Sequence, residues 1–188
     1  MIHYKKAGTQ AELKGILHLQ QQNLAPALTE AEMNSQGFVT VMHSLEMLQR
    51  LNDIEPHIIA KDNENVVAYL LAMTAQSQDN IPVLRPMFGL FRNVPFAGKT
   101  IADFHYLVVG QVCVDKNYRS QGILDDCYAF YRQAYQNTYD FAVTEIAANN
   151  PRSLRAHKRV GFEDVYRYTA PDGVEWVIVV WNWNGIKS

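Results

Sequence analysis

The sequence predicts a single α/β domain, residues 1–188, with a mixed central sheet. Apolar runs of strand length alternate with longer segments in which apolar residues recur at helical spacing. Gly, Pro, Asn and Asp separate these segments, and no internal repeat or linker interrupts them. A chain of 188 residues, 48% of them apolar, can bury a substantial core. The expected order of elements is β-α-α-β-β-β-α-β-α-β-β.

Periodicity and caps place the individual elements. Thr9 can cap a first helix whose apolar stripe contains Leu13, Ile16 and Leu17. The segment 66–74 is apolar on both faces, which is typical of a central strand, and the polar segment 29–37 is expected to be irregular. In chain order we expect a strand over 2–6, helices over 10–23 and 39–51, strands over 57–60, 66–74 and 105–114, a helix over 123–135, a strand over 141–147, a helix over 151–160, and a hairpin of strands over 163–169 and 174–183.

The segment 76–103 shows no clear periodicity and contains three prolines, Pro82, Pro86 and Pro95. Two interpretations stay open. It is either an irregular loop with a short helix packed on the core, or a lid or dimer surface beside a pocket, because long loops in compact domains often carry function. Trp176, Trp181 and Trp183 of the last strand could pack in the core or supply a homodimer surface. The usual burial of aromatic residues favours the core.

Bulk properties exclude several classes of function. The formal charge of −2 gives no support for a nucleic-acid or anionic-membrane partner. No apolar run approaches the ~20 residues that a membrane span needs, and the start of the chain lacks a signal peptide's apolar core. Cys113 and Cys127 are expected to be buried, reduced thiols. The six histidines are scattered without metal-ligand spacing. We therefore expect a cytoplasmic protein without a metal.

The run V-C-V-D-K-N-Y-R-S-Q-G-I-L, residues 112–124, carries the clearest functional signal. An apolar strand ends in a polar turn of small residues, and a helix begins near Ile123. Such a helix start leaves several backbone N–H groups unpaired beside the positive end of the helix dipole. The run therefore predicts a site for a phosphate-bearing ligand.

Two motifs together resemble the GNAT superfamily of N-acetyltransferases. The sequence R-S-Q-G-I-L, residues 119–124, is similar to the family's cofactor motif, Gln/Arg-x-x-Gly-x-Gly/Ala. The sequence N-P-R-S-L-R-A-H-K-R-V-G-F, residues 150–162, looks like its second motif, in which Asn precedes a small residue, a Tyr and a final Gly-Phe. Three positions differ: Leu124 replaces a small residue, Ser120 replaces a frequent glycine, and His157 stands where the family often has tyrosine.

The resemblance implies acetyl-CoA, or another acyl-CoA, as cosubstrate. Backbone N–H groups of the turn would bind its pyrophosphate, and the preceding strand would pair with its amide-rich pantetheine arm as an added strand does. That pairing works best if the strand splays from its neighbour. Asn150 can also simply cap the following helix. The residues that we assign to the cofactor are Val112, Cys113, Val114, Arg119, Ser120, Gln121, Gly122, Ile123, Leu124, Asn150 and Ser153.

The resemblance also suggests a catalytic residue. His157 occupies the position at which the family's tyrosine often protonates the departing CoA thiolate, and a histidine of suitable pKa can act as such a general acid. The alternative is that His157 only packs beside the cofactor sulfur. The family's usual base positions fall at Val108 and Gly110, and neither side chain can take a proton. The base is therefore left unassigned among His105, Tyr106, Gln111 and Glu145.

Two functions of different classes follow. The first is an acetyl-CoA-dependent N-acyltransferase whose acceptor is a small amine, an amino acid or a protein N-terminus. Its acceptor pocket would lie between the N-terminal helices, the segment 76–103 and the closing hairpin, where Glu30, Glu32, Tyr106 and Tyr168 are candidate lining residues. The alternative, suggested by the missing base, is a CoA-binding sensor or regulatory domain with little chemistry. A nucleic-acid module built on the basic segment 152–159 has no matching motif.

Overall fold

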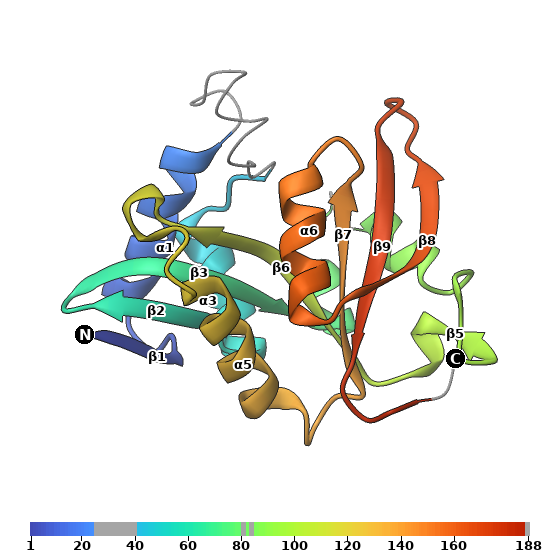
Figure 1. Ribbon diagram of the computed structural model, residues 1–188, viewed down its shortest axis with the longest axis horizontal. Helices are drawn as coiled ribbons and strands as arrows, with labels where there is room; N and C mark the ends of the chain where they lie inside the picture. The colour runs from blue at the N-terminus through green and yellow to red at the C-terminus, as the bar shows by residue number, and fades with distance from the viewer. Residues whose placement is uncertain (25–40, 80–81, 83–84, 187–188) are drawn as a thin grey trace.

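A seven-stranded sheet in the order β1-β2-β3-β6-β7-β9-β8 forms the centre of the molecule (Figure 1). The computed structural model describes residues 1–24, 41–79, 82 and 85–186, so the expected irregular segment 29–37, with Glu30 and Glu32, lies outside the described residues. The strands are β1 (Ile2–Lys6), β2 (Ile58–Asp62), β3 (Asn65–Met73), β6 (Tyr106–Val114), β7 (Phe141–Ala147), β8 (Glu163–Thr169) and β9 (Glu175–Asn182). The helices are α1 (Gln10–Asn23), α3 (Leu45–Ile54), α4 (Arg85–Leu90), α5 (Ile123–Tyr135) and α6 (Pro151–Val160).

The pairing of the strands confirms the predicted mixed α/β sheet. Neighbouring strands run antiparallel except for β6 and β7, which are parallel and joined by the crossover helix α5. β3 lies between β2 and β6 and is buried along most of its length, as its apolar sequence predicts. The order of the main elements along the chain also agrees with the expectation.

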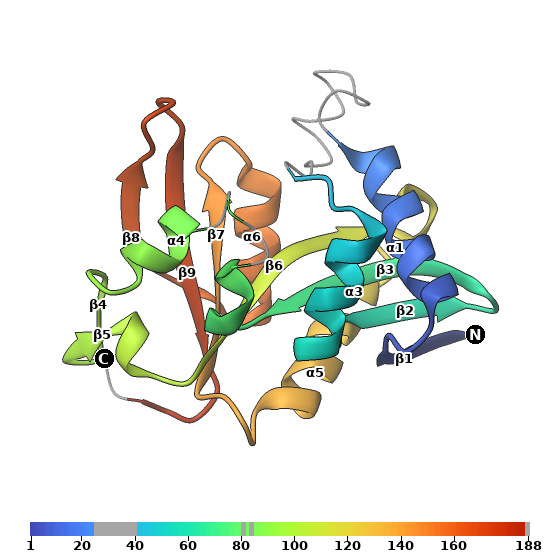
Figure 2. The same cartoon turned by 180° about the vertical axis from the view of Figure 1, so that it is seen from behind.

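Helices cover both faces of the sheet. α5 and α6 lie on one face, whereas α1, α3 and α4 lie on the other (Figures 1 and 2). Each face has its own buried apolar cluster. Leu13, Leu48 and Phe88 belong to the cluster beneath α1, α3 and α4. Tyr131 and Phe162 belong to the cluster on the face of α5 and α6.

The N-terminal helices show how caps fix helix boundaries. The Thr9 hydroxyl accepts a hydrogen bond from the N–H of Glu12, whose carboxylate accepts one from the N–H of Thr9, so α1 begins with a capping box. α3 begins only after Ser44, and the predicted helical start near residue 39 is wrong for the described residues 41–44. The N–H of the buried His43 donates instead to the Gln20 side chain, which holds this stretch against α1.

Short helices, turns and a small hairpin make up much of the described part of the segment 76–103. It contains a 3-10 turn (Ala75–Asp79), α4, the two-stranded hairpin of β4 (Pro95–Phe96) and β5 (Lys99–Thr100), and a second 3-10 turn (Ile101–Asp103). The expected short helix packed on the core is present as α4, and Met87, Phe88 and Phe91 of the segment are buried. A role as lid or dimer surface stays a prediction.

Most tryptophans at the last strand and both cysteines are buried in the core, as expected. Trp181 and Trp183 are buried on β9 and just after it, whereas Trp176 is half-buried. Cys113 and Cys127 are buried free thiols, and burial raises the pKa of each to about 12. In the part of the chain that the structure describes, no helix is both long and apolar enough to span a bilayer.

Candidate functional site

The site is built on a gap between the two parallel strands. β6 and β7 pair over only three residue pairs, Tyr106–Val108 with Phe141–Val143. Beyond these, β6 continues on β3 and β7 continues on β9, so the two strands diverge (Figure 1). The Thr144 hydroxyl donates to the Val109 carbonyl at 2.7 Å, where the ladder ends. The splay that strand pairing with a pantetheine arm requires is therefore present.

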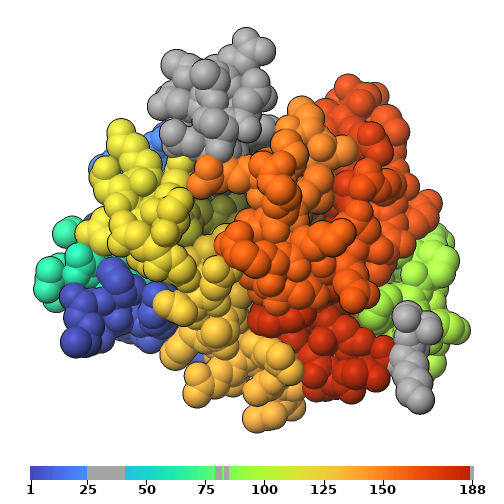
Figure 3. Space-filling model, viewed as in Figure 1, coloured from blue at the N-terminus to red at the C-terminus, as the bar shows by residue number. Residues whose placement is uncertain are grey.

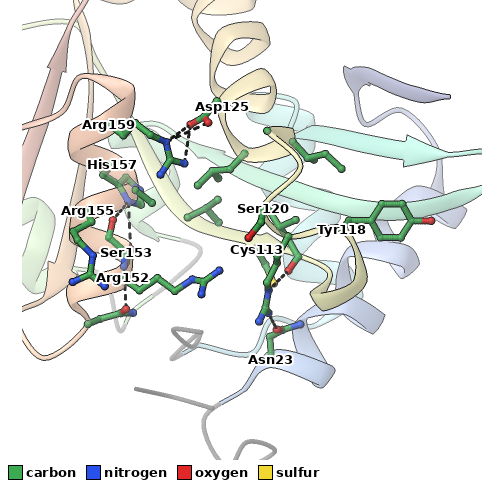
Figure 4. Close-up of a pocket in the computed structure, with 18 residues that line it drawn as sticks. Asn23, Cys113, Tyr118, Ser120, Asp125, Arg152, Ser153, Arg155, His157 and Arg159 are labelled. Atoms are coloured by element: carbon green, nitrogen blue, oxygen red, sulfur yellow. Dashed lines mark hydrogen bonds and ion pairs between the residues drawn. The ribbon is translucent and has the colours of Figure 1, made fainter. Parts of the chain in front are cut away.

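A first cavity, of about 530 Å³, opens from this gap toward α5 and α6. Figure 3 shows its mouth as a hollow between the segment that follows β6 and helix α6, and Figure 4 shows its lining side chains. We call it the cofactor cavity. Its lining includes ten of the residues assigned to a cofactor from sequence, together with His157: Val112, Cys113, Val114, Arg119, Ser120, Gly122, Ile123, Leu124, Asn150 and Ser153.

The turn before α5 contains two residues with a left-handed backbone conformation. Gly122 caps the helix with φ of +80°, and Ser120 has φ of +62°. Both angles lie in the left-handed region that favours glycine. The backbone amides of Ile123 and Leu124 donate no hydrogen bond to another described residue. They therefore offer donors at the positive end of the α5 dipole.

Arg119 fixes the base of this turn. Its Nε donates to the Val114 carbonyl at 3.0 Å, and its Nη2 donates to the Asn23 side-chain oxygen at 2.5 Å. These bonds join the end of β6 to the end of α1. Arg119 therefore shapes the turn as well as adding charge to the cavity.

Helix α6 adds most of the positive charge. Arg152, Arg155 and Arg159 line the cavity, and Arg152 reaches from α6 toward the turn (Figure 4). The pKa of Arg152 is lowered, first by burial and then by the nearby charges of Arg119 and Arg155. Arg159 is paired with Asp125 of α5 at 3.0 Å. Several guanidinium groups around one cavity suit a multiply charged anion.

The start of α6 places small polar groups at the gap. The Asn150 side chain accepts a hydrogen bond from the N–H of Ser153 at 3.2 Å, so Asn150 is the N-cap of the helix. The Ser153 hydroxyl lies 3.3 Å from Nδ1 of His157, one helical turn along. Both Asn150 and Ser153 line the cavity while they make these bonds.

His157 is buried with both ring nitrogens engaged. Nδ1 lies 2.8 Å from the Ser153 carbonyl, and since a carbonyl only accepts, Nδ1 carries the proton. Nε2 then accepts a hydrogen bond from the Tyr128 hydroxyl at 2.6 Å. Burial lowers the pKa of His157 to about 4. The imidazole is therefore neutral near pH 7, and its one N–H already has a partner.

A second cavity, also of about 530 Å³, opens from the gap on the face of α4. We call it the acceptor cavity. It shares four residues with the cofactor cavity: Val112, Asn150, Ser153 and His157. Glu145 of β7 lines it, and its carboxylate accepts a hydrogen bond of 2.5 Å from the Tyr168 hydroxyl of β8. Burial raises the pKa of Glu145 above its ordinary value, although this hydrogen bond opposes the rise.

Gln111 joins the wall of the acceptor cavity to the N-terminal helices. Its Nε2 donates to the Val41 carbonyl at 2.8 Å, and its Oε1 accepts from Gln20 and from the Tyr69 hydroxyl. Because both polar atoms of its side chain are engaged, Gln111 ties β6 to the stretch at Val41 and to α1. Gly110, beside it, marks a register shift against β3, and a Cβ there would meet Met73.

Comparison with solved structures identifies the architecture. No protein-family model and no curated protein sequence match the chain. An acetyltransferase of the GNAT family from Streptococcus agalactiae superposes with a TM-score of 0.66 at 11% identity, covering 97% of this chain and 95% of that one. The chain has the GNAT fold.

Two further solved structures superpose over nearly the whole chain. A chain of the NatC complex bound to Gag peptide and CoA has a TM-score of 0.64 at 13% identity, covering 97% of this chain and 98% of that one. The ribosomal-protein-S18-alanine N-acetyltransferase from Escherichia coli has a TM-score of 0.62 at 14% identity, covering 100% and 96%. Identities this low show the fold alone, and it is the fold that the two motifs predict.

Within this GNAT fold, one of the predicted cofactor residues does not line the cofactor cavity, and several residues that were not predicted do line it. Gln121 does not line the cofactor cavity, because its side chain turns outward and donates to the Asn117 carbonyl. Several residues that no motif position marks do line it, namely Asn23, Tyr118, Asp125, Arg152, Arg155, Ala156 and Arg159. The charge run of residues 152–159 was the one available signal for its arginines.

The structure also shows which of the candidate bases line the acceptor cavity. Val108 is fully buried, and Gly110 lines the acceptor cavity without a side chain. His105 is exposed outside it, and Tyr106 packs in the aromatic core. Glu145 and Gln111 do line the acceptor cavity, and of these two only Glu145 can take a proton. Among the described residues, no group of three or more His, Cys, Asp and Glu side chains is placed to hold a metal ion.

Proposed function

We propose that this GNAT-fold protein is an N-acetyltransferase that moves an acetyl group directly from acetyl-CoA to a primary amine of a small molecule or peptide. The observation that carries the proposal is the junction of the two cavities at Val112, Asn150, Ser153 and His157. A thioester entering from one cavity and an amine entering from the other would meet there. Such proximity favours attack without a covalent enzyme intermediate.

The cofactor cavity fits acetyl-CoA on chemical grounds. The unpaired amides at the start of α5 suit a pyrophosphate, and Arg119, Arg152 and Arg155 supply charge on either side of it. The exposed edge of β6 from Val112 to Val114 suits the amides of the pantetheine arm. A covalent route through Cys113 is disfavoured, since burial raises the pKa of its thiol to about 12.

Glu145 is the proposed general base. The incoming amine nitrogen forms a bond to the thioester carbonyl carbon, the carbon–sulfur bond then breaks, and the proton lost by nitrogen goes to the Glu145 carboxylate. A raised pKa suits this role, because a stronger base takes a proton more readily near neutral pH. The Tyr168 hydroxyl holds the carboxylate in place.

His157 and Ser153 would act on the departing thiolate. A direct general-acid role for His157 requires its imidazolium form, and burial makes that form scarce near pH 7. We propose instead that the Nδ1–H of His157 orients Ser153, whose hydroxyl then donates a hydrogen bond to the thiolate. The N-terminus of α6 adds its dipole to this stabilisation. The direct role stays a hypothesis that a pH profile distinguishes.

Turnover tests the proposed function against the alternative of a CoA-binding sensor. The purified chain is mixed with acetyl-CoA and a broad panel of primary amines, and release of the CoA thiol is followed. We expect release above the hydrolysis rate with at least one amine, and mass spectrometry should find the acetyl group on nitrogen. Calorimetric binding of CoA without release across the whole panel would support the sensor.

A further inference from the structure

The acceptor cavity has a charge opposite to that of the cofactor cavity. Glu145 and Asp172 line it, and no lysine or arginine does so among the described residues. Among the described residues, the lining therefore presents carboxylates to an occupant and no lysine or arginine that could pair with an anionic group.

Most of the remaining lining is apolar and comes from separate elements. Met87 of α4, Val109 of β6, Ile146 of β7 and Trp176 of β9 all contribute to it. Val109 is 1% exposed and Met87 is 4% exposed, so these side chains are held by the core. A rigid apolar wall beside the half-buried carboxylate of Glu145 suits an amine attached to an apolar group.

We infer that the acceptor is the α-amine of an apolar amino acid residue whose carboxyl group is in amide linkage, as at a peptide N-terminus. This inference rests on the proposed function. A free amino acid would bring its own carboxylate, two bonds from the amine, into the cavity that Glu145 and Asp172 line, and like charges repel. An α-amine, with an ordinary pKa of about 8, is also more easily deprotonated than a lysine side chain, with a pKa of about 10.4.

Matched acceptors test the inference on the unmodified protein. We expect kcat/KM with L-methioninamide to exceed that with L-methionine by at least about 30-fold, since the two differ only in the carboxylate. The α-amide of glutamic acid and Nα-acetyl-lysinamide should also be poor acceptors. Equal turnover of methionine and methioninamide would overturn the inference while leaving the N-acetyltransferase function in place. No thiol release with any amine would overturn both.

A pair of variants tests whether the charge of the acceptor cavity causes the preference for methioninamide over methionine. Ala170 lines the cavity, and its backbone N–H bonds to the Val174 carbonyl, so a new side chain leaves that bond intact. Ala170→Arg adds a cation, and Ala170→Gln adds similar bulk without charge. We expect the ratio of methionine to methioninamide turnover to rise at least about tenfold in the arginine variant only. The same ratio in both variants, with both active on methioninamide, contradicts the inference.

Discussion

The two cavities share one edge, yet the chain builds them differently. The cofactor cavity comes mostly from two short segments, 112–125 and 150–159, and it concentrates arginines beside a helix N-terminus. The acceptor cavity takes its side chains from stretches spread between Val41 and Trp176, and it combines carboxylates with apolar walls. A phosphate can be bound by local backbone geometry, whereas an amine with a side chain needs surfaces that only the complete fold brings together.

The largest expected effect is a loss of kcat/KM when the base in the acceptor cavity is removed, with no change of CoA binding in the cofactor cavity. Glu145→Gln should lower kcat/KM by about 10²- to 10⁴-fold, as removal of a general base does. CoA affinity should stay unchanged, because Glu145 does not line the cofactor cavity. Steady-state kinetics and calorimetry measure the two quantities. A variant with full activity would remove Glu145 as the base.

The pH profile sharpens this prediction. Because burial raises the pKa of Glu145, the active carboxylate form should be lost as pH falls through a value above the ordinary glutamate pKa of about 4.3. Tyr168→Phe is the matched variant. It removes the hydrogen bond that lowers the Glu145 pKa, so the acidic limb of kcat/KM should move to higher pH. A limb that stays in place speaks against Glu145 as the titrating group.

The second effect belongs to the cofactor cavity. Gly122→Glu should weaken CoA binding by about 100-fold, because it places a negative charge at the expected pyrophosphate position. A Cβ at Gly122 meets no atom within 4 Å, but its φ of +80° strains any L side chain. Gly122→Ala therefore controls for strain, and it should keep most of the affinity. Equal CoA affinities of the two variants in calorimetry would show that the turn does not bind phosphate.

The third effect is on the free energy of unfolding, and it comes from His157 at the junction of the two cavities. The folded-state pKa of His157, about 4, is below the unfolded value of about 6.5, so the unfolded chain binds the proton first as pH falls. Its neutral form stabilises the fold fully above pH 6.5, and this contribution, roughly 3 kcal/mol, is lost progressively toward pH 4. The buried His43 and His57 act in the same direction. Urea unfolding at pH 7 and at pH 5 measures the fall.

His157→Phe isolates the share of His157 in this pH dependence. The free energy of unfolding should change less between pH 7 and pH 5 in the variant than in the parent. At pH 7 the variant should be about 1–3 kcal/mol less stable, because the Tyr128 hydroxyl loses its buried partner. Its kcat should also fall while CoA affinity changes little. A parental kcat that is constant from pH 6 to pH 8 would contradict a direct general-acid role, which needs the imidazolium.

The smallest effect concerns backbone strain in the cofactor turn. Ser120 adopts φ of +62°, which costs a residue with a side chain about 1–2 kcal/mol. Ser120→Gly relieves this strain but makes the unfolded chain more flexible. We therefore expect a net gain of at most about 1 kcal/mol in the free energy of unfolding, without loss of CoA affinity. A clear loss of affinity would assign the Ser120 hydroxyl a contact with the cofactor.

The comparison of the cavities also explains what sequence could predict. The fold class, the order of elements and most of the residues that line the cofactor cavity follow from local patterns: strand, turn, cap and helix. Glu145 is an ordinary strand residue in sequence, and only pairing of β7 with β9 and of β9 with β8 brings Tyr168 to it. The start of α3 was misplaced for a similar reason, since Gln20, far away in sequence, binds the backbone of His43.

The short ladder between β6 and β7 has a mechanical consequence. At its closed end, Phe96 and Phe104 pack edge-on against Phe141, which stacks on Tyr106. This aromatic cluster packs where the two strands are still paired, at Tyr106 and Phe141. The hairpin of β4 and β5 supplies Phe96 to it, so residues outside both cavities brace the point from which the strands part.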